Sequence, residues 1–379
     1  MTKLNRLYEE QGQSAWLDNL TRTSLRDGSL ARFTHSGIRG VTANPTIFAK
    51  SIGGSDAYDD QSASLTATGK SVVEAYWDLL ISDVQEALKL LRPTFDASGG
   101  TDGFVSIEVS PELAHDASGT IEAARDLYER IDQPNVLIKI PATSEGLSAI
   151  RKLTGEGLCL NITLIFSLER YNNVIDAYLD GLKELFDKEG DLSTVHSVAS
   201  FFVSRVDSEV DRRLEAIGTP ETLSLRGRAA VAQAKLAYQM FQERFSGERW
   251  NALEACGARL QRPLWASTSA KNPAYSPTLY VDSLIGPHTV NTLTANTIEA
   301  FESDGTVART IDSDLDDARF VLGQLRDVGV DMVDVGQALE DQGIAAFHDS
   351  FGEVLDSLKK KFVSVRESAT RTAEQSSGT

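Results

Sequence analysis

The chain has 379 residues, of which 37 are Lys or Arg and 55 are Asp or Glu, so its formal net charge is −18. This excess of acid opposes nonspecific binding to nucleic acid or to an anionic membrane, and any anionic ligand would need a local basic pocket. The length suits one large barrel or two ordinary domains.

Strands and helices alternate from the N-terminus onward. Short apolar runs bounded by turn formers predict strands, and apolar residues at helical spacing predict amphipathic helices. In chain order we expect a strand at 14–18, a helix at 21–33 interrupted by Gly28, a strand at 38–48 running into an Asn-Pro break, a helix from 56 to about 91, a loop at 93–103, a strand at 103–113, and a helix at 118–131 capped by Ser118.

The alternation continues through the second half. We expect strands at 135–143, 157–167 and 288–298, a strand at 196–207 that runs into a helix, and a strand and loop at 262–272. We also expect helices at 144–153 and 167–189 and a long helical region at about 205–257, broken near Gly218 and Pro220. Eight strands alternating with helices indicate the α/β class and match a (β/α)8 TIM barrel. A doubly wound open sheet is the alternative.

The C-terminal part differs in composition from the rest. Residues from about 306 to 363 read as two or three additional helices, and 364–379 is polar enough to predict a disordered tail. We therefore expect one domain at 1–363, comprising the barrel and a C-terminal helical extension.

Residues 135–143, NVLIKIPAT, place Lys139 inside an apolar strand. A buried ammonium without a partner is costly, whereas a partly desolvated amine can attack a carbonyl and form a Schiff base. The simpler interpretation is a strand-end lysine whose stem packs while its head reaches water.

Polar residues recur where the predicted strands end, which in such a barrel is where the active site lies. These candidates are Asp18, Asn44, Glu108, Lys139, Asn161, Thr163, Ser200, Arg205, Ser269 and Lys271. Individually, Asp18 could cap a helix, Asn44 could shape a turn and Thr163 could serve strand propensity. The hydroxyl at 269 and the cations at 205 and 271 could be exposed. Their joint occurrence favours an active site.

Other chemistries find little support. The five histidines are scattered without HxH or HExxH spacing, so no metal is expected, and no phosphate-binding glycine motif occurs. The two cysteines, Cys159 and Cys256, form no CxxC motif, and no segment has the apolar run of a signal peptide or membrane span. We expect a cytoplasmic, soluble protein without a cofactor.

Two stretches, GVTANPTIF at 40–48 and VLIKIPATSEGL at 136–147, closely resemble the signatures of the transaldolase family, within the Schiff-base class I aldolase superfamily and its longer bacterial type. Similarity continues through about residues 14–300 in WLDNLTRTSL, SIEVSPELA, NITLIFS and SFFVSRVD. The resemblance implies a (β/α)8 barrel in the pentose phosphate pathway. It also implies reversible transfer of a dihydroxyacetone unit between phosphorylated sugars.

The resemblance also implies a role for each matched residue. Lys139 would form the Schiff base, Asp18 would be the acid/base, and Glu108 with Thr163 would handle a catalytic water. The residues implied to bind substrate are Asn44, Asn161, Ser200, Phe202, Arg205, Ser269 and Lys271. Among these, Arg205, Ser269 and Lys271 would hold the phosphate.

Some positions depart from the family pattern, and two alternatives remain. Ala43 stands where Ser or Thr is usual, and Lys271 stands where many members have Arg. A fructose 6-phosphate aldolase is the nearest alternative, but those relatives tend to carry Tyr at the position of Phe202 and to lack the acid at Glu108. A barrel that binds phosphosugars without covalent chemistry is the other. Oligomeric state and the role of the C-terminal helices do not follow from the sequence.

Overall fold

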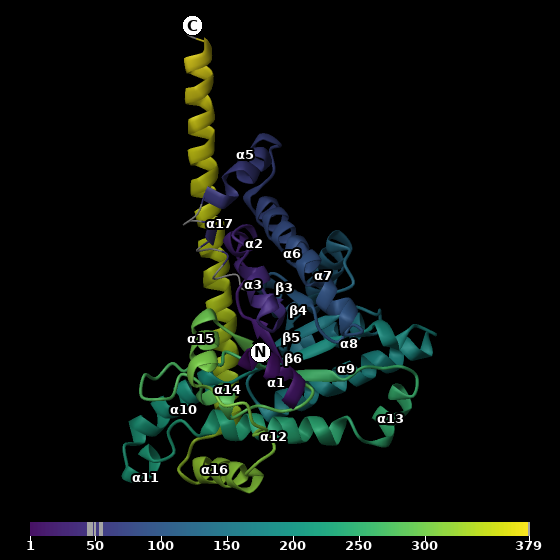
Figure 1. Ribbon diagram of the computed structural model, residues 1–379, viewed down its shortest axis with the longest axis vertical. Helices are drawn as coiled ribbons and strands as arrows, with labels where there is room; N and C mark the ends of the chain where they lie inside the picture. Colours follow the sequence, from purple (N-terminus) through teal and green to yellow (C-terminus); the bar gives the residue numbers. More distant parts are fainter. Residues whose placement is uncertain (44–47, 49–50, 53–55, 378–379) are drawn as a thin grey trace.

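Eight parallel strands form a closed barrel in the computed structural model, which describes residues 1–43, 48, 51–52 and 56–377 (Figure 1). The strands are β1 (Gln13–Leu17), β2 (Ile38–Thr42), β3 (Phe104–Glu108), β4 (Val136–Pro141), β5 (Leu160–Ile165), β6 (Ser197–Phe202), β7 (Gln261–Ala266) and β8 (Thr289–Leu293). Strands β1 and β8 pair over five residues and close the ring. The predicted (β/α)8 barrel is confirmed, and the open-sheet alternative is wrong.

Helices surround the barrel and extend beyond it. They are α1 (Lys3–Gln11), α2 (Arg22–Arg26), α3 (Ser29–His35), α5 (Asp59–Ala67), α6 (Val72–Ala97), α7 (Ala117–Ile131), α8 (Ser144–Thr154), α9 (Leu168–Asp187), α10 (Ser204–Ile217), α11 (Pro220–Leu223), α12 (Ala229–Arg244), α13 (Glu248–Glu254), α14 (Leu279–Asp282), α15 (Ala295–Asp304), α16 (Leu315–Asp327) and α17 (Met332–Ser377). Short 3-10 turns occupy η1 (Asp56–Tyr58), η2 (Pro111–Leu113) and η3 (Leu192–Thr194).

The barrel interior is filled by side chains of unequal size. Trp16 on β1 is fully buried, and a Cβ added at Gly40 on the neighbouring β2 would lie 2.5 Å from its indole ring. Glycine at position 40 therefore makes room for the tryptophan, as close packing of a small barrel requires.

Several predicted boundaries are wrong for identifiable reasons. The loop expected at 93–103 begins late, because α6 continues past Pro93 to Ala97, where Phe95 packs edge-on against Phe104 with ring centroids 5.4 Å apart. Asp116, rather than Ser118, caps α7 by accepting a hydrogen bond from the amide of Gly119. The strand expected at 288–298 ends at Leu293, since Thr294 caps α15.

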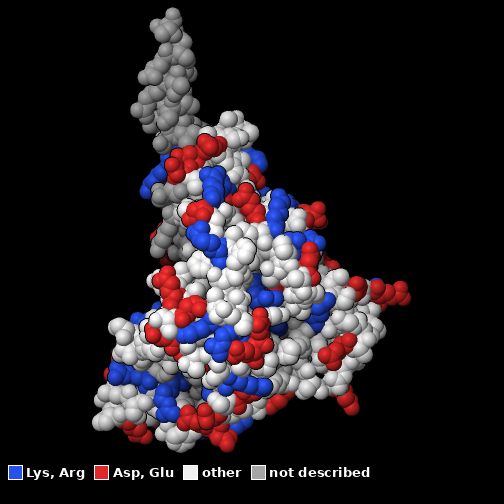
Figure 2. Space-filling model, in the orientation of Figure 1, with Lys and Arg blue, Asp and Glu red and all other residues white. Residues whose placement is uncertain are grey.

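The C-terminal extension contains the two helices α16 and α17, within the predicted number. In Figure 1, α17 (yellow) runs alongside the barrel and projects well past it. The division into one domain at 1–363 and a tail at 364–379 stays a prediction. No helix in the described ranges is both long and apolar enough to cross a membrane. On the face seen in Figure 2, acidic and basic side chains are interspersed.

Candidate active site

A cavity of about 180 Å³ opens at the carboxyl ends of the barrel strands. Its lining comes from seven strands or the segments that follow them, and from α17. The lining residues are Asp18, Thr42, Lys139, Thr163, Ser200, Phe202, Arg205, Leu264, Ala266, Ser267, Lys271, Thr292 and Phe347. The position agrees with the end of a (β/α)8 barrel where active sites lie.

Lys139 and Glu108 form a buried ion pair at this mouth. The two residues are direct partners in the register of β3 and β4, which places both side chains on the same side of the sheet. Lys139 Nζ donates to Glu108 Oε2 at 2.9 Å, and the residues are only 9% and 8% exposed. Lys139 is therefore buried together with a charged partner. The ion pair offsets the desolvation cost that a lysine in an apolar strand would otherwise bear.

Asn161, the partner of Lys139 in the register of β4 and β5, takes part in a chain of hydrogen bonds inside the barrel. Its amide nitrogen donates to Ser106 Oγ at 2.9 Å, and its carbonyl oxygen accepts from Ser200 Oγ at 2.7 Å. Asn161 does not line the cavity, whereas Ser200 does. The contact between Asn161 and substrate stays a prediction.

Thr163 faces the cavity from β5. Its hydroxyl is buried and has no hydrogen-bond partner among the residues that the structure describes. A buried hydroxyl without a partner is uncommon and costs free energy, so it indicates a group left available for a ligand or a water.

Asp18 follows β1 and also reaches the cavity. Its Oδ1 accepts a hydrogen bond from Thr42 Oγ1 at 3.0 Å. The helix-cap explanation for Asp18 does not hold, because Thr21 caps α2 by accepting from the amide of Ser24. Thr42 is a residue that the sequence analysis missed, although its place at the end of β2 was a usable signal.

Two cations, Arg205 and Lys271, share one side of the cavity. Neither side chain forms an ion pair within the described part of the chain. Burial lowers the pKa of Arg205, while the nearby Asp18 carboxylate acts in the opposite direction. The Arg205 guanidinium lies 5.6 Å from the ring centroid of Phe202. An anion entering here would meet two cations that form no ion pair with the described residues, with the Asp18 carboxylate nearby.

Ser269 is directed elsewhere. Its hydroxyl lies 2.7 Å from Thr297 Oγ1 and 3.1 Å from Thr294 Oγ1, at the start of α15, and it does not line the cavity. Ser267 lines it instead, in a left-handed backbone conformation with φ 56°. Asn44 lies outside the described residues.

Phe347 of α17 forms a roof over the lysine. Its ring centroid is 5.5 Å from Lys139 Nζ, and the residue is 8% exposed. Two buried glycines allow α17 to approach this closely: a Cβ would lie 2.9 Å from Ser167 if added at Gly336, and 2.9 Å from Leu164 if added at Gly343. The sequence analysis missed Phe347, whose only signal was its place on an apolar helix face.

A second contact fixes α17 over the barrel. Arg170 of α9 and Glu340 of α17 form an ion pair with an N–O distance of 3.2 Å, in which both side chains are largely buried. Glu340 lies between Gly336 and Gly343 on the same face of the helix. The C-terminal extension is thus part of the cavity wall.

A closed (β/α)8 barrel with a buried lysine in the cavity at the carboxyl ends of its strands is typical of barrel enzymes whose active site contains a lysine. Similarity to known proteins identifies the family. The family model described as transaldolase/fructose-6-phosphate aldolase matches residues 15–358. The chain therefore belongs to the transaldolase/fructose-6-phosphate aldolase family and is an enzyme of the transaldolase type.

Individual relatives agree over nearly the whole chain. A transaldolase of Parafrankia sp. (strain EAN1pec) is 48% identical over 352 residues, covering 92% of this chain and 95% of that protein. Transaldolase 1 of Streptomyces avermitilis is 48% identical, covering 94% of each chain. A transaldolase of Mycolicibacterium smegmatis is 47% identical, covering 92% of this chain and 94% of its own.

Proposed function

We propose that the chain transfers a dihydroxyacetone unit reversibly from sedoheptulose 7-phosphate to glyceraldehyde 3-phosphate, giving erythrose 4-phosphate and fructose 6-phosphate. A Schiff base on Lys139 carries the unit between donor and acceptor. The observation that carries the proposal is the burial of this lysine at the cavity wall, 2.9 Å from a carboxylate. A role in the pentose phosphate pathway and a cytoplasmic location belong to the same proposal.

The first step is imine formation. Glu108 is close enough to accept a proton from the Lys139 ammonium, which leaves an amine that can attack the ketone carbon of the donor. Loss of water from the resulting carbinolamine requires proton transfer to the departing hydroxyl. The free hydroxyl of Thr163 supports a role in holding that water.

Cleavage follows once the protonated imine is in place. Asp18 accepts the proton of the sugar hydroxyl next to the breaking carbon–carbon bond, and the electron pair of that bond moves into the imine. The aldehyde product leaves, and an acceptor aldehyde reacts with the carbanion equivalent by the reverse steps. Water then hydrolyses the imine and restores Lys139.

The cations at the cavity wall support phosphorylated substrates. Arg205 and Lys271 are without carboxylate partners in the part of the chain described, although the protein has a net charge of −18. A phosphate binds well where unneutralised cations converge. Arg205 can donate a two-pronged hydrogen bond, whereas Lys271 supplies a point charge.

Transfer is favoured over simple cleavage by two residues. Phe202, which lines the cavity, cannot donate the proton that a tyrosine could give to the carbanion intermediate, and Glu108 contacts the lysine directly. Steady release of dihydroxyacetone from fructose 6-phosphate without an acceptor would contradict the transferase proposal and favour the aldolase alternative.

Trapping of the imine tests the covalent step. We expect borohydride reduction in the presence of fructose 6-phosphate to leave a three-carbon or six-carbon adduct on Lys139, located by peptide mass spectrometry. Lys235 is a matched control, because it is also 9% exposed but donates to the carbonyl of Ser313, far along the chain from the cavity residues.

The variants then give a clear decision. Lys139→Ala should fold and yield no adduct, whereas Lys235→Ala should keep the adduct. An adduct that persists in Lys139→Ala, or none in the wild type, would contradict the Schiff base and favour a barrel that binds phosphosugars without covalent chemistry.

A further inference from the structure

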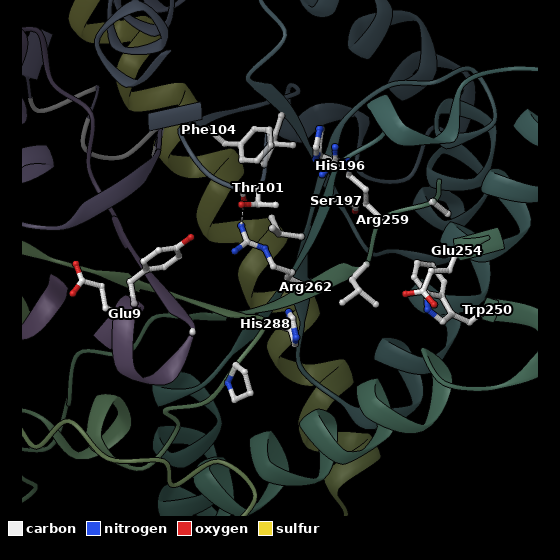
Figure 3. Close-up of a pocket in the computed structure, with 17 residues that line it drawn as sticks. Glu9, Thr101, Phe104, His196, Ser197, Trp250, Glu254, Arg259, Arg262 and His288 are labelled. Atoms are coloured by element: carbon white, nitrogen blue, oxygen red, sulfur yellow. Dashed lines mark hydrogen bonds between the residues drawn. The ribbon is translucent and has the colours of Figure 1, made fainter. Parts of the chain in front are cut away.

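A second cavity opens at the opposite end of the barrel from the lysine. Its volume is about 590 Å³, compared with about 180 Å³ for the catalytic cavity. It is lined by residues at the amino ends of strands, including Phe104, Ser197 and Arg262, and by residues that precede strands, such as His196 and His288. None of the residues assigned to catalysis lines it (Figure 3).

Two arginines, Arg259 and Arg262, and two glutamates, Glu9 and Glu254, line this basal cavity, and the arginines lie between the glutamates. Arg39 and Arg262 both pair with the single carboxylate of Asp102, at 2.8 and 3.1 Å. Asp102 is completely buried and also accepts a hydrogen bond from Ser14. Arg262, which of these two arginines is the one that lines the cavity, therefore shares its carboxylate with a second guanidinium and is only partly neutralised.

Arg259 is the other arginine of the lining, and it forms no ion pair with the described residues. Its Nε donates to the carbonyl of Ser193 at 2.6 Å, which orients the guanidinium. Over the described ranges, no carboxylate pairs with it and its terminal nitrogens donate to no protein group. In Figure 3, Arg259 and Arg262 lie in the middle of the cavity lining, with Glu9 and Glu254 on either side of them. Both acids are exposed to solvent.

The neighbouring His196 is affected both by burial and by the charges of these arginines. Burial, followed by the charges of Arg259 and Arg262, lowers the pKa of His196 to about 3. The ring is therefore neutral near pH 7 and packs against Phe104, with centroids 5.1 Å apart. It supplies a flat, uncharged surface beside the cations.

The remaining walls are apolar. Trp250, Leu137 and Phe104 line the cavity and are almost completely buried. A cavity within the size range of small-molecule sites, with apolar walls and a few converging polar groups, is the usual form of a ligand pocket. A forked guanidinium with free donors selects a planar or tetrahedral oxyanion.

We propose that the basal cavity binds a small organic anion, with its phosphate or carboxylate group on Arg259 and its apolar or aromatic body against Trp250 and Phe104. The free terminal nitrogens of Arg259 and the partly neutralised Arg262 favour the anion, and the apolar walls favour a ring over a sugar. This site is separate from the catalytic cavity and does not rest on the proposed reaction.

Calorimetric titration with phenyl phosphate, benzoate and the neutral benzyl alcohol tests the proposal. We expect one or both anions to bind at millimolar concentration or below, and benzyl alcohol to bind at least about tenfold more weakly. Preference between phenyl phosphate and benzoate identifies the oxyanion. Equal binding of benzyl alcohol, or no binding of either anion, would overturn the proposal.

Matched variants locate the site. Arg259→Ala should weaken anion binding at least about tenfold while turnover of fructose 6-phosphate with erythrose 4-phosphate as acceptor stays unchanged, which shows that the variant is folded. Ala258→Phe, which fills the cavity and keeps the arginine, should also weaken it. Arg205→Ala, at the catalytic mouth, should leave it unaltered. Loss of binding only in Arg205→Ala would place the anion in the catalytic cavity and refute a basal site.

Discussion

Replacing Arg205 by alanine tests whether the unpaired cation of the catalytic cavity holds the substrate phosphate. Its guanidinium is half-buried and forms no ion pair with a described residue, so the nearby Asp18 carboxylate offsets its desolvation cost only in part. Because no ion pair is broken, we expect the free energy of unfolding of Arg205→Ala to stay equal to, or slightly above, that of the wild type.

The expected effect on catalysis follows from the hydrogen bonds that the Arg205 guanidinium can donate to the substrate phosphate. A hydrogen bond to a charged group contributes about 1.5–3 kcal/mol, so losing the equivalent of one such bond should lower kcat/KM for fructose 6-phosphate roughly ten- to hundredfold. The loss should lie mostly in KM, because the phosphate does not change during the reaction.

The assay compares donors with and without the phosphate. With fructose in place of fructose 6-phosphate, Arg205→Ala and the wild type should have nearly equal kcat/KM. Arg326→Ala, which removes an exposed arginine from α16, is the control for a general effect of charge. An equal loss of kcat/KM for the two donors would refute a phosphate contact by Arg205.

The remaining predictions concern the roof and a buried acid. Phe347→Ala should slow borohydride trapping of Lys139 roughly two- to tenfold, because loss of the ring admits water to the place where the imine forms; an unchanged rate would contradict this. Gly343→Ala should destabilise the fold by about 1–3 kcal/mol, measured by urea denaturation, since its Cβ would lie 2.9 Å from a β5 side chain. Gly352→Ala, with open space around it on the same helix, should instead be neutral or stabilise by about 0.5–1 kcal/mol. Burial raises the pKa of Asp207 from 3.8 to about 6, so its contribution to stability is present below about pH 4 and is lost as the pH rises through 6. Relative to Asp207→Asn, the wild-type free energy of unfolding should fall by about 2 kcal/mol between pH 4 and 7, and parallel pH profiles would contradict the assignment.

The barrel could be predicted from the sequence because its determinants are local. Apolar β-branched runs bounded by turn formers locate the strands, and polar residues that interrupt them, such as Glu108 and Lys139, stand out against that pattern. Since the carboxyl ends of parallel strands meet at one face, their convergence followed from the fold. Their catalytic roles stay predictions.

Contacts between segments that are far apart in the sequence could not be predicted in this way. Phe347 is one apolar residue among many on α17, and its position over Lys139 depends on how closely the helix approaches β5. Ser269 lies in the expected loop, but the hydroxyls of Thr294 and Thr297 hold it away from the cavity. Asn161 is on the expected strand, yet interior hydrogen bonds occupy its amide.

The roof residue also has a consequence for the order in which the protein is made. All eight strands are complete by Leu293, whereas Phe347 follows them on a separate helix, α17. Protein segments fold as they leave the ribosome, N-terminal parts first. The barrel can therefore assemble on the nascent chain while Lys139 is still uncovered, and Phe347 covers the lysine only after α17 has been made.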